Sequence, residues 1–565
     1  MLAVLAVAVV FLAICFRLGY LPLLAPDEGR NAEVGREMKD SGAWLVPTYN
    51  GLDYLDKPAF YFKLVAFSLS LAGINETAAR LPSALFGMGL VALVFAFCRR
   101  VYGIRCGLIA AAVVASTPLY LANARTVIFD IALAFFVCAA IFCGYLAEET
   151  TGCTRRNWYR LGAASSGLAT LVKGPIGLLI PVLVLVLYYV FEGKRGAWKR
   201  LLAPLNLLIF FALTLPWFVG LCLTHRDFFH YGLVEESFHR FTTAKAFHRA
   251  EPPYFYLLIV AATFFPWSLL LPEGAVTAWK QRRALSSADR LCLVWSVAVV
   301  IFFSLSQSKL PGYILSATVS CGILVARMID TALRPGESKS SRMLNRAVVV
   351  FAAACLVTAV VAYGGRSQMQ VLARPLRIPA ADAQQLSQEV LPLIFALAVL
   401  SAVGWLAFAR RSAALVFVVF ACFAPLCANL GVGMLKVVYE AKSGRRIGAE
   451  LAGLSPQTEL VCLECFPNGL PFYLQRRVKL VSRDGREMTS NYIVYALGHA
   501  RDWPGQIIPV AQFESWLASR TGPTYLIARQ VDRDKLQAIA ASRKATVQTL
   551  SPEFVGVDLP AAGGS

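Results

Sequence analysis

Residues 203–222 read APLNLLIFFALTLPWFVGLC, a run of twenty residues without a charged side chain. An α-helix of this length rises about 30 Å, which matches the hydrocarbon core of a lipid bilayer. Because that core offers no water to the backbone, each N–H and C=O group must pair inside the segment. The stretch therefore predicts a helix that crosses a membrane.

Apolar runs of similar length recur along the 565-residue chain. The composition is 57% hydrophobic and 16% charged, whereas soluble globular proteins carry about 25% charged residues. We predict thirteen spans, near residues 2–19, 79–98, 104–121, 127–147, 159–172, 175–191, 203–222, 254–271, 289–306, 312–331, 346–363, 389–409 and 413–436. The first run lacks a small-residue cleavage site, so we expect it to be retained. The expected fold class is mainly α, a polytopic membrane protein of about thirteen transmembrane helices.

Short basic loops between these runs explain the net charge of +20. Such loops normally lie on the cytoplasmic side of a membrane. The longer loops 20–78, 223–253 and 364–388, and the tail after residue 437, then face the outside. A soluble protein of this charge would suggest nucleic-acid binding, but here the basic residues set the orientation. The expected partner is therefore the bilayer, and no nucleic acid is expected.

The first long loop, 20–78, holds two structured pieces. Residues 28–40 predict a helix with charged side chains on its polar side. Residues 59–73 (AFYFKLVAFSLSLAG) are apolar but short and contain Lys63. Counting them as a span would move every later basic loop to the wrong side. We therefore expect an interfacial helix at the outer surface.

Hydropathy falls after residue 437, and residues 437–565 predict a soluble α/β domain of ordinary size. Residues 461–466, 478–481 and 492–497 resemble strands, and 512–519 and 532–542 resemble helices. Cys462 and Cys465 form a CxxC pair on an expected strand, without a second pair. They indicate two unremarkable cysteines or a disulfide rather than a zinc or redox site.

Charged side chains gather at the expected outer edge of the membrane, where they cost energy unless they have a role. The set is Asp27, Glu28, Arg30, Asp56, Lys57, Asp130, Lys173, Arg240, His248 and Lys309, with Tyr313 beside the last. Carboxylates and several cations at one depth suit a phosphate-bearing substrate, because the cations neutralise the phosphate while the carboxylates hold a sugar or a metal. Plainer alternatives remain: solvated loop charges, a salt bridge of Arg30 within its helix, and Tyr313 as an interface anchor.

Four motifs carry a family resemblance. They are DEGRNAEVGREM at 27–38, GAWLVPTYNGLDYLDKP at 42–58, AARLPSA at 78–84 and SKLPGYIL at 308–315. Together they resemble the bacterial branch of the protein O-mannosyltransferase superfamily, closest to the lipid A aminoarabinose transferases. The resemblance implies the GT-C fold for a transmembrane catalytic domain over 1–436. It also implies inverting sugar transfer from a polyprenyl-phosphate donor, in a bacterial inner membrane, with the active site and residues 437–565 on the periplasmic side.

The resemblance also assigns roles. Asp27 matches the family's essential acidic residue and Asp130 its second loop aspartate, so these two are the expected catalytic residues. The expected substrate-binding residues are Glu28, Arg30, Lys57, Lys173, Arg240, Lys309 and Tyr313, with Lys57 on the carrier phosphate. Asp56 and His248 match positions that bind zinc in the aminoarabinose transferases. This chain departs from the family with aspartate instead of glutamate at position 56, and with Gly312 where a histidine is usual.

The leaving group of such a transfer is already a phosphate diester, so it needs charge stabilisation rather than a proton. A hydroxyl acceptor would need a base, for which Asp27 is the candidate. A phosphate acceptor on lipid A would need only orientation. The sequence leaves open the sugar and the acceptor (lipid A, another glycan or a protein). A polyprenyl-lipid transporter or flippase is the alternative from another class; such proteins tend to show internal repeats and charges near the bilayer middle, and this chain shows neither clearly.

Overall fold

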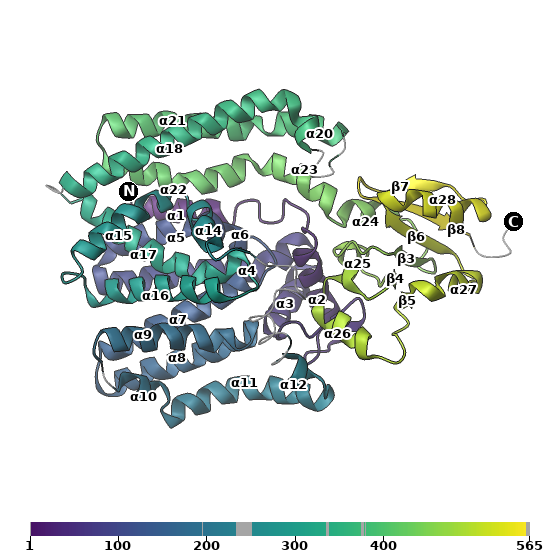
Figure 1. Cartoon of the computed structure of the whole chain (residues 1–565), viewed down its shortest axis with the longest axis horizontal. Coiled ribbons are helices and arrows are strands. Elements are labelled where there is room, and N and C mark those ends of the chain that lie inside the picture. Colours follow the sequence, from purple (N-terminus) through teal and green to yellow (C-terminus); the bar gives the residue numbers. More distant parts are fainter. Residues whose placement is uncertain are drawn as a thin grey trace. The chain divides into compact units, whose positions relative to one another are not determined.

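The chain folds mainly into helices, with a six-stranded sheet in its C-terminal part (Figure 1). The computed structural model describes residues 2–560 apart from 195, 233–234, 236–250, 335–337, 374–377 and 379. Internal contacts divide the chain into two compact units. The helical unit comprises Met1–Leu18, Ser83–Gly364 and Leu391–Gly431, and the mixed unit comprises Gly19–Pro82, Gly365–Val390 and Val432–Ser565.

All thirteen predicted spans coincide with helices, which confirms the mainly α fold class. These helices are α1 (Leu2–Ile14), α4 (Glu76–Tyr102), α5 (Ile104–Ala115) with α6 (Pro118–Ala124), α7 (Asp130–Glu148), α8 (Gly152–Lys173), α9 (Ile176–Phe191), α11 (Pro204–Thr224), α14 (Phe255–Thr263) with η2 (Trp267–Leu270) and α15 (Leu271–Lys280), α16 (Ser287–Leu305), η3 (Pro311–Ile314) with α17 (Leu315–Ala332), α18 (Ser338–Gly365), α21 (Leu391–Ala409) and α22 (Ala413–Leu430).

Fewer of these helices are long and apolar enough to cross a membrane by themselves. Within the described residues, eight helices are long and apolar enough to cross a membrane, and ten if each of two bent pairs counts as one span. The α5–α6 pair is bent by 71°, and the pair Phe255–Thr263 with Trp267–Lys280 by 113°. Helix α1 has 13 residues and α9 has 16, so each is shorter than the roughly 20 residues of a full span.

The basic loops that the sequence placed on one side of the membrane contact one another in the helical unit. Arg200 donates to Glu148 at 2.6 Å, and Arg105 donates to Asp330 at 2.5 Å. Glu148 ends α7, whereas Asp130 begins it. At 1.5 Å per residue, the two ends of this 19-residue helix lie about 28 Å apart. The basic loop that carries Arg200 and the residue Asp130 thus lie at opposite ends of the same helix.

The mixed unit contains the two helices predicted in the first loop. They are α2 (Asp27–Ser41) and α3 (Phe60–Ala72), with β1 (Thr48–Tyr49) and β2 (Leu52–Asp53) between them. Helix α3 buries Phe62 and Val65 but exposes Phe67 by 59% and Leu71 by 73%. An exposed apolar stripe on a 13-residue helix suits a helix that lies in a membrane surface. The unit also contains α19 (Met369–Ala373), α20 (Ala380–Glu389), α23 (Val432–Lys442) and α24 (Arg445–Leu451).

The sheet of the mixed unit confirms the predicted α/β character of the C-terminal part. Its strand order is β5-β4-β3-β6-β8-β7, parallel from β5 to β6 and antiparallel at β8 and β7. The strands are β3 (Glu459–Leu463), β4 (Lys479–Ser482), β5 (Ile507–Pro509), β6 (Thr524–Arg529), β7 (Val547–Thr549) and β8 (Phe554–Leu559). The accompanying helices are α25 (Leu470–Leu474), α26 (Asn491–His499), α27 (Phe513–Ala518) and α28 (Arg533–Ser542).

The prediction of a strand at residues 492–497 is wrong, because these residues belong to α26. Ser490 caps this helix by accepting a hydrogen bond from the Ile493 N–H at 3.3 Å. The Asp56 carboxylate accepts further hydrogen bonds from the N–H groups of Asn491 and Tyr492. Free N–H groups at a helix start favour such acceptors, and Asp56 lies too far away in sequence to be recognised as one.

The first loop packs against the C-terminal part within the mixed unit, although the sequence division placed a domain boundary near residue 437. Asn50 donates to the Val478 C=O at 2.7 Å and accepts from the Val478 N–H at 2.9 Å. Tyr473 accepts a hydrogen bond from the Leu23 N–H at 2.7 Å. A side chain on Gly29 would lie 2.6 Å from the backbone of Gly469, so this approach requires glycine.

We predict that Asn50→Gly destabilises the mixed unit by about 2 kcal/mol, because both polar backbone groups of the buried Val478 lose their partner. Asn50 has a φ of +54°, which glycine adopts freely, so the change isolates the hydrogen bonds from backbone strain. Thermal unfolding of the purified full chain measures the loss. A stability equal to that of the wild type would contradict this account of the contact.

Candidate active site

Each unit carries one cluster of the predicted site residues. Arg240 and His248 lie outside the described residues. Their predicted roles in substrate and zinc binding therefore stay predictions.

The cluster of the helical unit joins three segments that the sequence separates widely. Asp130 is the first residue of α7, Lys173 is the last residue of α8, and Tyr313 lies in η3. Lys173 Nζ forms a close ion pair with Asp130 Oδ1 and lies 4.7 Å from the centroid of the Tyr313 ring. The Lys173 and Asp130 side chains are only 12% and 14% exposed. Three of the predicted site residues thus meet.

The chemistry of this cluster follows from its charges. Asp130 lies at a helix N-terminus, where the helix dipole attracts negative groups, and Lys173 places a cation beside it. A Cβ atom on Gly312 would lie 3.2 Å from Asp130 Oδ2, so a larger residue there would press on the carboxylate. An arriving anion would compete with Asp130 for Lys173, which leaves the carboxylate free to hold a hydroxyl or amino group.

Lys309 is held by backbone carbonyls of two segments. It is 6% exposed, and its Nζ donates to the Ser306 C=O of its own loop at 2.7 Å and to the Glu251 C=O before α14 at 2.9 Å. Tyr256 of α14 accepts from the Leu310 N–H and donates to the Leu310 C=O, both at 3.2 Å. These bonds fix the loop before η3 and the Lys309 side chain in it.

The cluster of the mixed unit begins with Asp27 and Arg30 on the first turn of α2. Arg30 donates to Asp27 at 2.5 Å and to the Thr489 carbonyl and hydroxyl at 2.7 and 2.9 Å. Burial acts to lower the pKa of Arg30, but the nearby Tyr54, Asp27 and Asp56 raise it above its ordinary value. Arg30 therefore stays positively charged, while the Asp27 side chain remains 54% exposed and accessible to a substrate.

Glu28 is buried in an ion pair, although the sequence assigned it to substrate binding. Its carboxylate accepts two hydrogen bonds from Arg80, at 2.8 and 2.9 Å, and both residues are 2% exposed. Arg80 also donates to the carbonyls of Leu21 and Pro22, at 2.6 and 2.8 Å. The pair therefore ties the start of α2 to the chain segment before it and fixes the place of Asp27.

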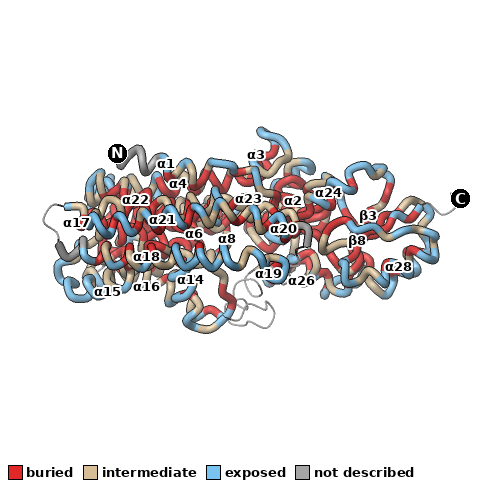
Figure 2. Tube along the Cα trace, turned by 90° about the horizontal axis from the view of Figure 1, so that it is seen from above, coloured by how far each residue is buried: buried red, intermediate tan, exposed pale blue. Residues whose placement is uncertain are grey.

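Helix α2 is buried over eleven consecutive residues, from Glu28 to Met38, despite its charges (Figure 2). Arg36 binds Glu33 through two hydrogen bonds of 2.6 and 2.7 Å. Burial raises the pKa of Glu33 to about 7, against the opposing effect of Arg36. Glu37 accepts hydrogen bonds from Thr48 at 2.6 Å and from the Gly51 N–H at 2.9 Å. These charges are thus satisfied within the protein and serve its structure.

Asp56 and Lys57 lie where the first loop meets α26. Asp56 Oδ1 accepts from the Tyr492 N–H at 2.7 Å, and Oδ2 accepts from the Asn491 N–H at 3.1 Å. Lys57 Nζ donates to the Asp56 C=O at 2.6 Å. Asp56 is 8% exposed. Its carboxylate therefore joins the first loop to the start of α26.

A zinc site at Asp56 does not follow from the described residues. They contain no group of three or more His, Cys, Asp or Glu side chains that could hold a metal ion, whereas zinc takes three or four such ligands. The donor set described for Asp56 therefore does not fit zinc by itself. Zinc at Asp56 and His248 stays a prediction, which elemental analysis of purified protein and of its His248→Ala variant tests.

Sequence reasoning missed the partners that hold these residues. Arg80 stands in the AARLPSA motif, but nothing in its neighbourhood identifies Glu28 as its partner. Thr489 carries no motif, and it lies 459 positions after Arg30. Cys462 and Cys465 are both buried and free, which excludes the predicted disulfide and leaves two unremarkable cysteines.

Comparison with known proteins agrees with this fold and these motifs. The family model of dolichyl-phosphate-mannose-protein mannosyltransferases matches residues 56–219. An undecaprenyl phosphate-alpha-4-amino-4-deoxy-L-arabinose arabinosyl transferase from Erwinia tasmaniensis is 31% identical over 60% of this chain and 62% of its own length. One from Sodalis glossinidius is 34% identical over 60% and 61%. The alignments thus span less than two thirds of these relatives.

Similarity in structure extends over the whole chain. The crystal structure of ArnT from Cupriavidus metallidurans bound to undecaprenyl phosphate aligns with a TM-score of 0.84 and 25% sequence identity. That alignment covers 99% of this chain and 98% of the other. The structure of the same protein in the apo state gives a TM-score of 0.82.

We predict that substitutions of the neighbouring residues Glu28 and Asp27 have very different effects on the stability of the fold. Glu28→Gln leaves the buried Arg80 without a counter-charge and should destabilise the fold by roughly 3–5 kcal/mol. Asp27→Asn keeps a hydrogen-bond acceptor beside the buried Arg30, which also donates to Thr489, and should therefore cost less, roughly 1–2 kcal/mol. Thermal unfolding of the two variants beside the wild type measures this difference. Equal losses in both variants would show that the Glu28–Arg80 pair does not hold α2.

Proposed function

We propose that the chain is a glycosyltransferase of the GT-C family and that it transfers a sugar from a polyprenyl-phosphate donor. The proposed sugar is 4-amino-4-deoxy-L-arabinose and the proposed acceptor is lipid A. One observation carries the proposal: 99% of the chain aligns, with a TM-score of 0.84, with a protein crystallised with undecaprenyl phosphate. The sugar is the one in the names of the relatives from Erwinia and Sodalis.

The proposed location is a bacterial inner membrane, with the reaction on its periplasmic side. The Glu148 end of α7, which the basic loop with Arg200 contacts, then faces the cytoplasm. The Asp130 end of the same helix faces outwards. Polyprenyl-phosphate sugars keep their tail in the bilayer, so a donor would present its phosphate at such a membrane boundary.

Asp27 is the proposed catalytic carboxylate. It is the one charged residue of the first turn of α2 whose side chain is more than half exposed. Arg30 holds it in place, and the Glu28–Arg80 pair fixes the turn that carries it. With a hydroxyl acceptor, Asp27 would take the proton as the acceptor oxygen bonds to the anomeric carbon. With a phosphate acceptor it would orient the acceptor or the sugar.

Lys57 is the proposed partner of the donor phosphate. The departing polyprenyl phosphate carries its negative charge away from the anomeric carbon, and a fixed cation lowers the energy of that state. Lys57 is held by the Asp56 carbonyl, and Asp56 is held by two backbone N–H groups of α26. In the helical unit, Asp130 and Lys173 form a second carboxylate–cation pair, for which we propose a role in substrate binding.

Protein O-mannosylation is the second candidate, because the family model that matches residues 56–219 is named for it. The two candidates differ in donor sugar and in acceptor, and both use a polyprenyl-phosphate carrier. A transporter remains the alternative from another class. In the helical unit, however, the Asp130–Lys173 pair lies at helix ends rather than in the middle of a span.

We predict that the purified protein in vesicles adds aminoarabinose to lipid A when undecaprenyl phosphate-α-4-amino-4-deoxy-L-arabinose is supplied. Mass spectrometry of lipid A detects the product. Asp27→Asn should lower kcat by at least about 100-fold, because the carboxylate that orients the acceptor or the sugar is lost. Lys57→Ala should raise the donor KM about 10-fold or more, because a charge-assisted hydrogen bond is lost.

Asp53→Asn is the matched control, since it changes an exposed carboxylate of the same loop to an amide. It should retain wild-type transfer. Full activity of Asp27→Asn would remove that residue from the mechanism. Modification of a serine- or threonine-containing peptide with mannosyl phosphoryl polyprenol, together with unmodified lipid A, would favour the second candidate. Donor movement across the vesicle membrane without any product would favour the transporter.

A further inference from the structure

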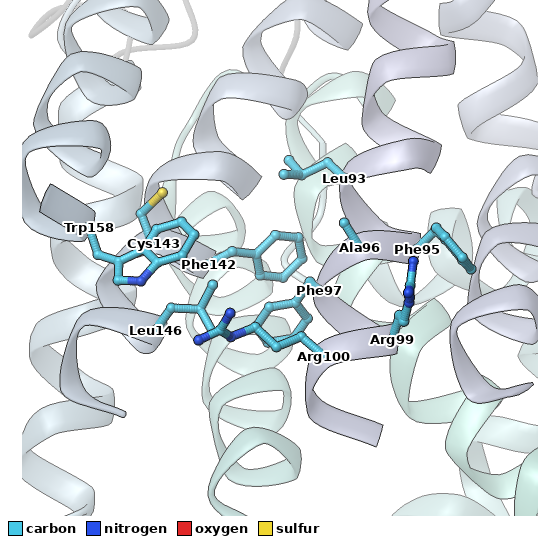
Figure 3. Close-up of a pocket in the computed structure, with 10 residues that line it drawn as sticks. All are labelled: Leu93, Phe95, Ala96, Phe97, Arg99, Arg100, Phe142, Cys143, Leu146 and Trp158. Carbon is cyan, nitrogen blue, oxygen red and sulfur yellow. The ribbon is translucent and has the colours of Figure 1, made fainter. Parts of the chain in front are cut away.

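A cavity of about 440 Å³ opens in the helical unit between α4, α7 and α8 (Figure 3). Its size falls within the roughly 300–1,000 Å³ of pockets that hold small molecules. Leu93, Ala96, Phe97 and Arg100 of α4 line one wall at the spacing of a single helix face. Phe142 of α7 stacks on Phe97, with ring centroids 4.0 Å apart and planes 11° apart. The inner part of the cavity is therefore apolar.

Two arginines lie at the edge of this apolar cavity. Arg99 and Arg100 belong to the last turn of α4, and both are exposed. Figure 3 shows the Arg100 side chain beside Phe97 and Leu146. Its guanidinium lies 5.9 Å from the centroid of the Trp158 ring. Cationic groups thus border an opening whose interior is hydrocarbon-like.

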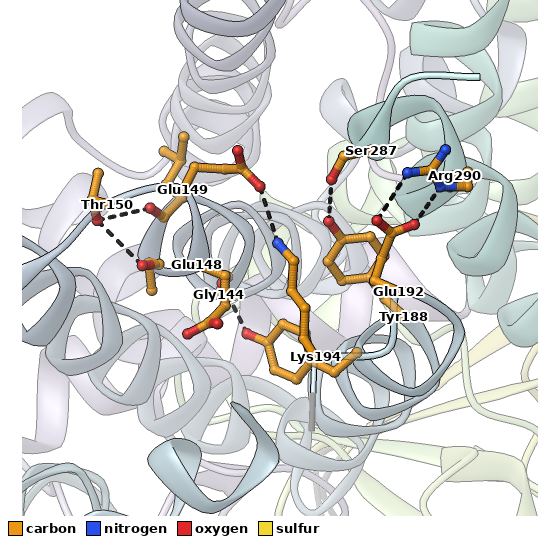
Figure 4. A network of polar contacts seen from close by, with 12 residues as sticks. Gly144, Glu148, Glu149, Thr150, Tyr188, Glu192, Lys194, Ser287 and Arg290 are labelled. Atoms are coloured by element: carbon orange, nitrogen blue, oxygen red, sulfur yellow. Dashed lines mark hydrogen bonds and ion pairs between the residues drawn. The ribbon is translucent and has the colours of Figure 1, made fainter. Parts of the chain in front are cut away.

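Figure 4 shows two cations of the helical unit that are matched by carboxylates. Lys194 binds Glu149 at 3.0 Å, and Arg290 binds Glu192 through two hydrogen bonds. Within the described part of the chain, neither Arg99 nor Arg100 forms an ion pair with a carboxylate. Two adjacent positive charges at the mouth of a cavity therefore lack a protein counter-charge.

Trp158 forms an aromatic wall of the cavity beside Arg100. Tryptophan is enriched where a membrane protein meets the headgroup level of the bilayer, because its ring is amphipathic. The cavity thus combines an apolar interior with an aromatic and cationic border.

We propose that this cavity binds an anionic phospholipid of the surrounding membrane, with an acyl chain in the apolar part and the phosphate at Arg99 and Arg100. Basic pockets between transmembrane helices bind anionic headgroups in this way. The cavity is distinct from the Asp130 cluster, because Leu146 and Asp130 are sixteen residues apart on α7, or about 24 Å. The lipid would be a resident component of the protein rather than the sugar donor.

The test uses the full-length protein purified in a neutral detergent and supplied with defined lipids. Phosphatidylglycerol should raise the midpoint of thermal unfolding in a saturable way and stay bound in native mass spectrometry. Phosphatidylcholine and inorganic phosphate should do neither. Arg99→Gln combined with Arg100→Gln should weaken phosphatidylglycerol binding at least tenfold. Arg410→Gln combined with Arg411→Gln, an exposed arginine pair in a loop after α21, should bind it as the wild type does.

Ala96→Phe separates the apolar requirement from the charge, since it fills the cavity and keeps both arginines. It should also lose bound phosphatidylglycerol. Equal binding by the wild type and by the Arg99/Arg100 double variant would overturn the proposal, whether or not Ala96→Phe folds. Equal stabilisation by phosphatidylcholine would overturn the role of the charge. Stabilisation by inorganic phosphate alone would show a simple anion site instead of a lipid site.

Discussion

A charged helix can be buried only where every charge finds a partner, and α2 imposes this constraint on the mixed unit. Its buried stretch from Glu28 to Met38 carries Glu28, Arg30, Glu33, Arg36 and Glu37. An unpaired charge in such a place costs several kcal/mol. The partners come from three parts of the chain: α2 itself, the nearby first loop with Arg80, and the C-terminal part. The first loop and the C-terminal part therefore have to fold as one unit.

This arrangement gives the first loop the rigid frame that the proposed chemistry requires. Loop residues need such a frame if they are to hold a reacting group in place. Here Arg30 is tied to Thr489, and Asp56 is tied to the first two N–H groups of α26. Asp27 and Lys57 are close to these fixed residues in the sequence. The C-terminal part thereby helps to hold the first loop in place.

The transmembrane helices could largely be predicted from the sequence, because the bilayer requires long apolar runs in the spans. The sequence predicted that Asp130, Lys173 and Tyr313 lie at the same depth at the membrane edge. In the structure these three residues are in contact. The partner of Glu28 could not be read, since Arg80 is 52 positions away and no local pattern links them. The prediction of a strand at 492–497 was wrong for a related reason. The carboxylate of Asp56, 435 positions before Asn491, helps to cap the helix that forms there.

The first loop is held by its contact with the C-terminal part, and amide hydrogen exchange measures that contact directly. Asp56→Ala removes the acceptor of the Asn491 and Tyr492 N–H groups. We expect at least tenfold faster exchange at these two amides, with no comparable change in Asp53→Ala. Exchange at the start of α26 that is the same in Asp56→Ala and in the wild type would contradict this expectation.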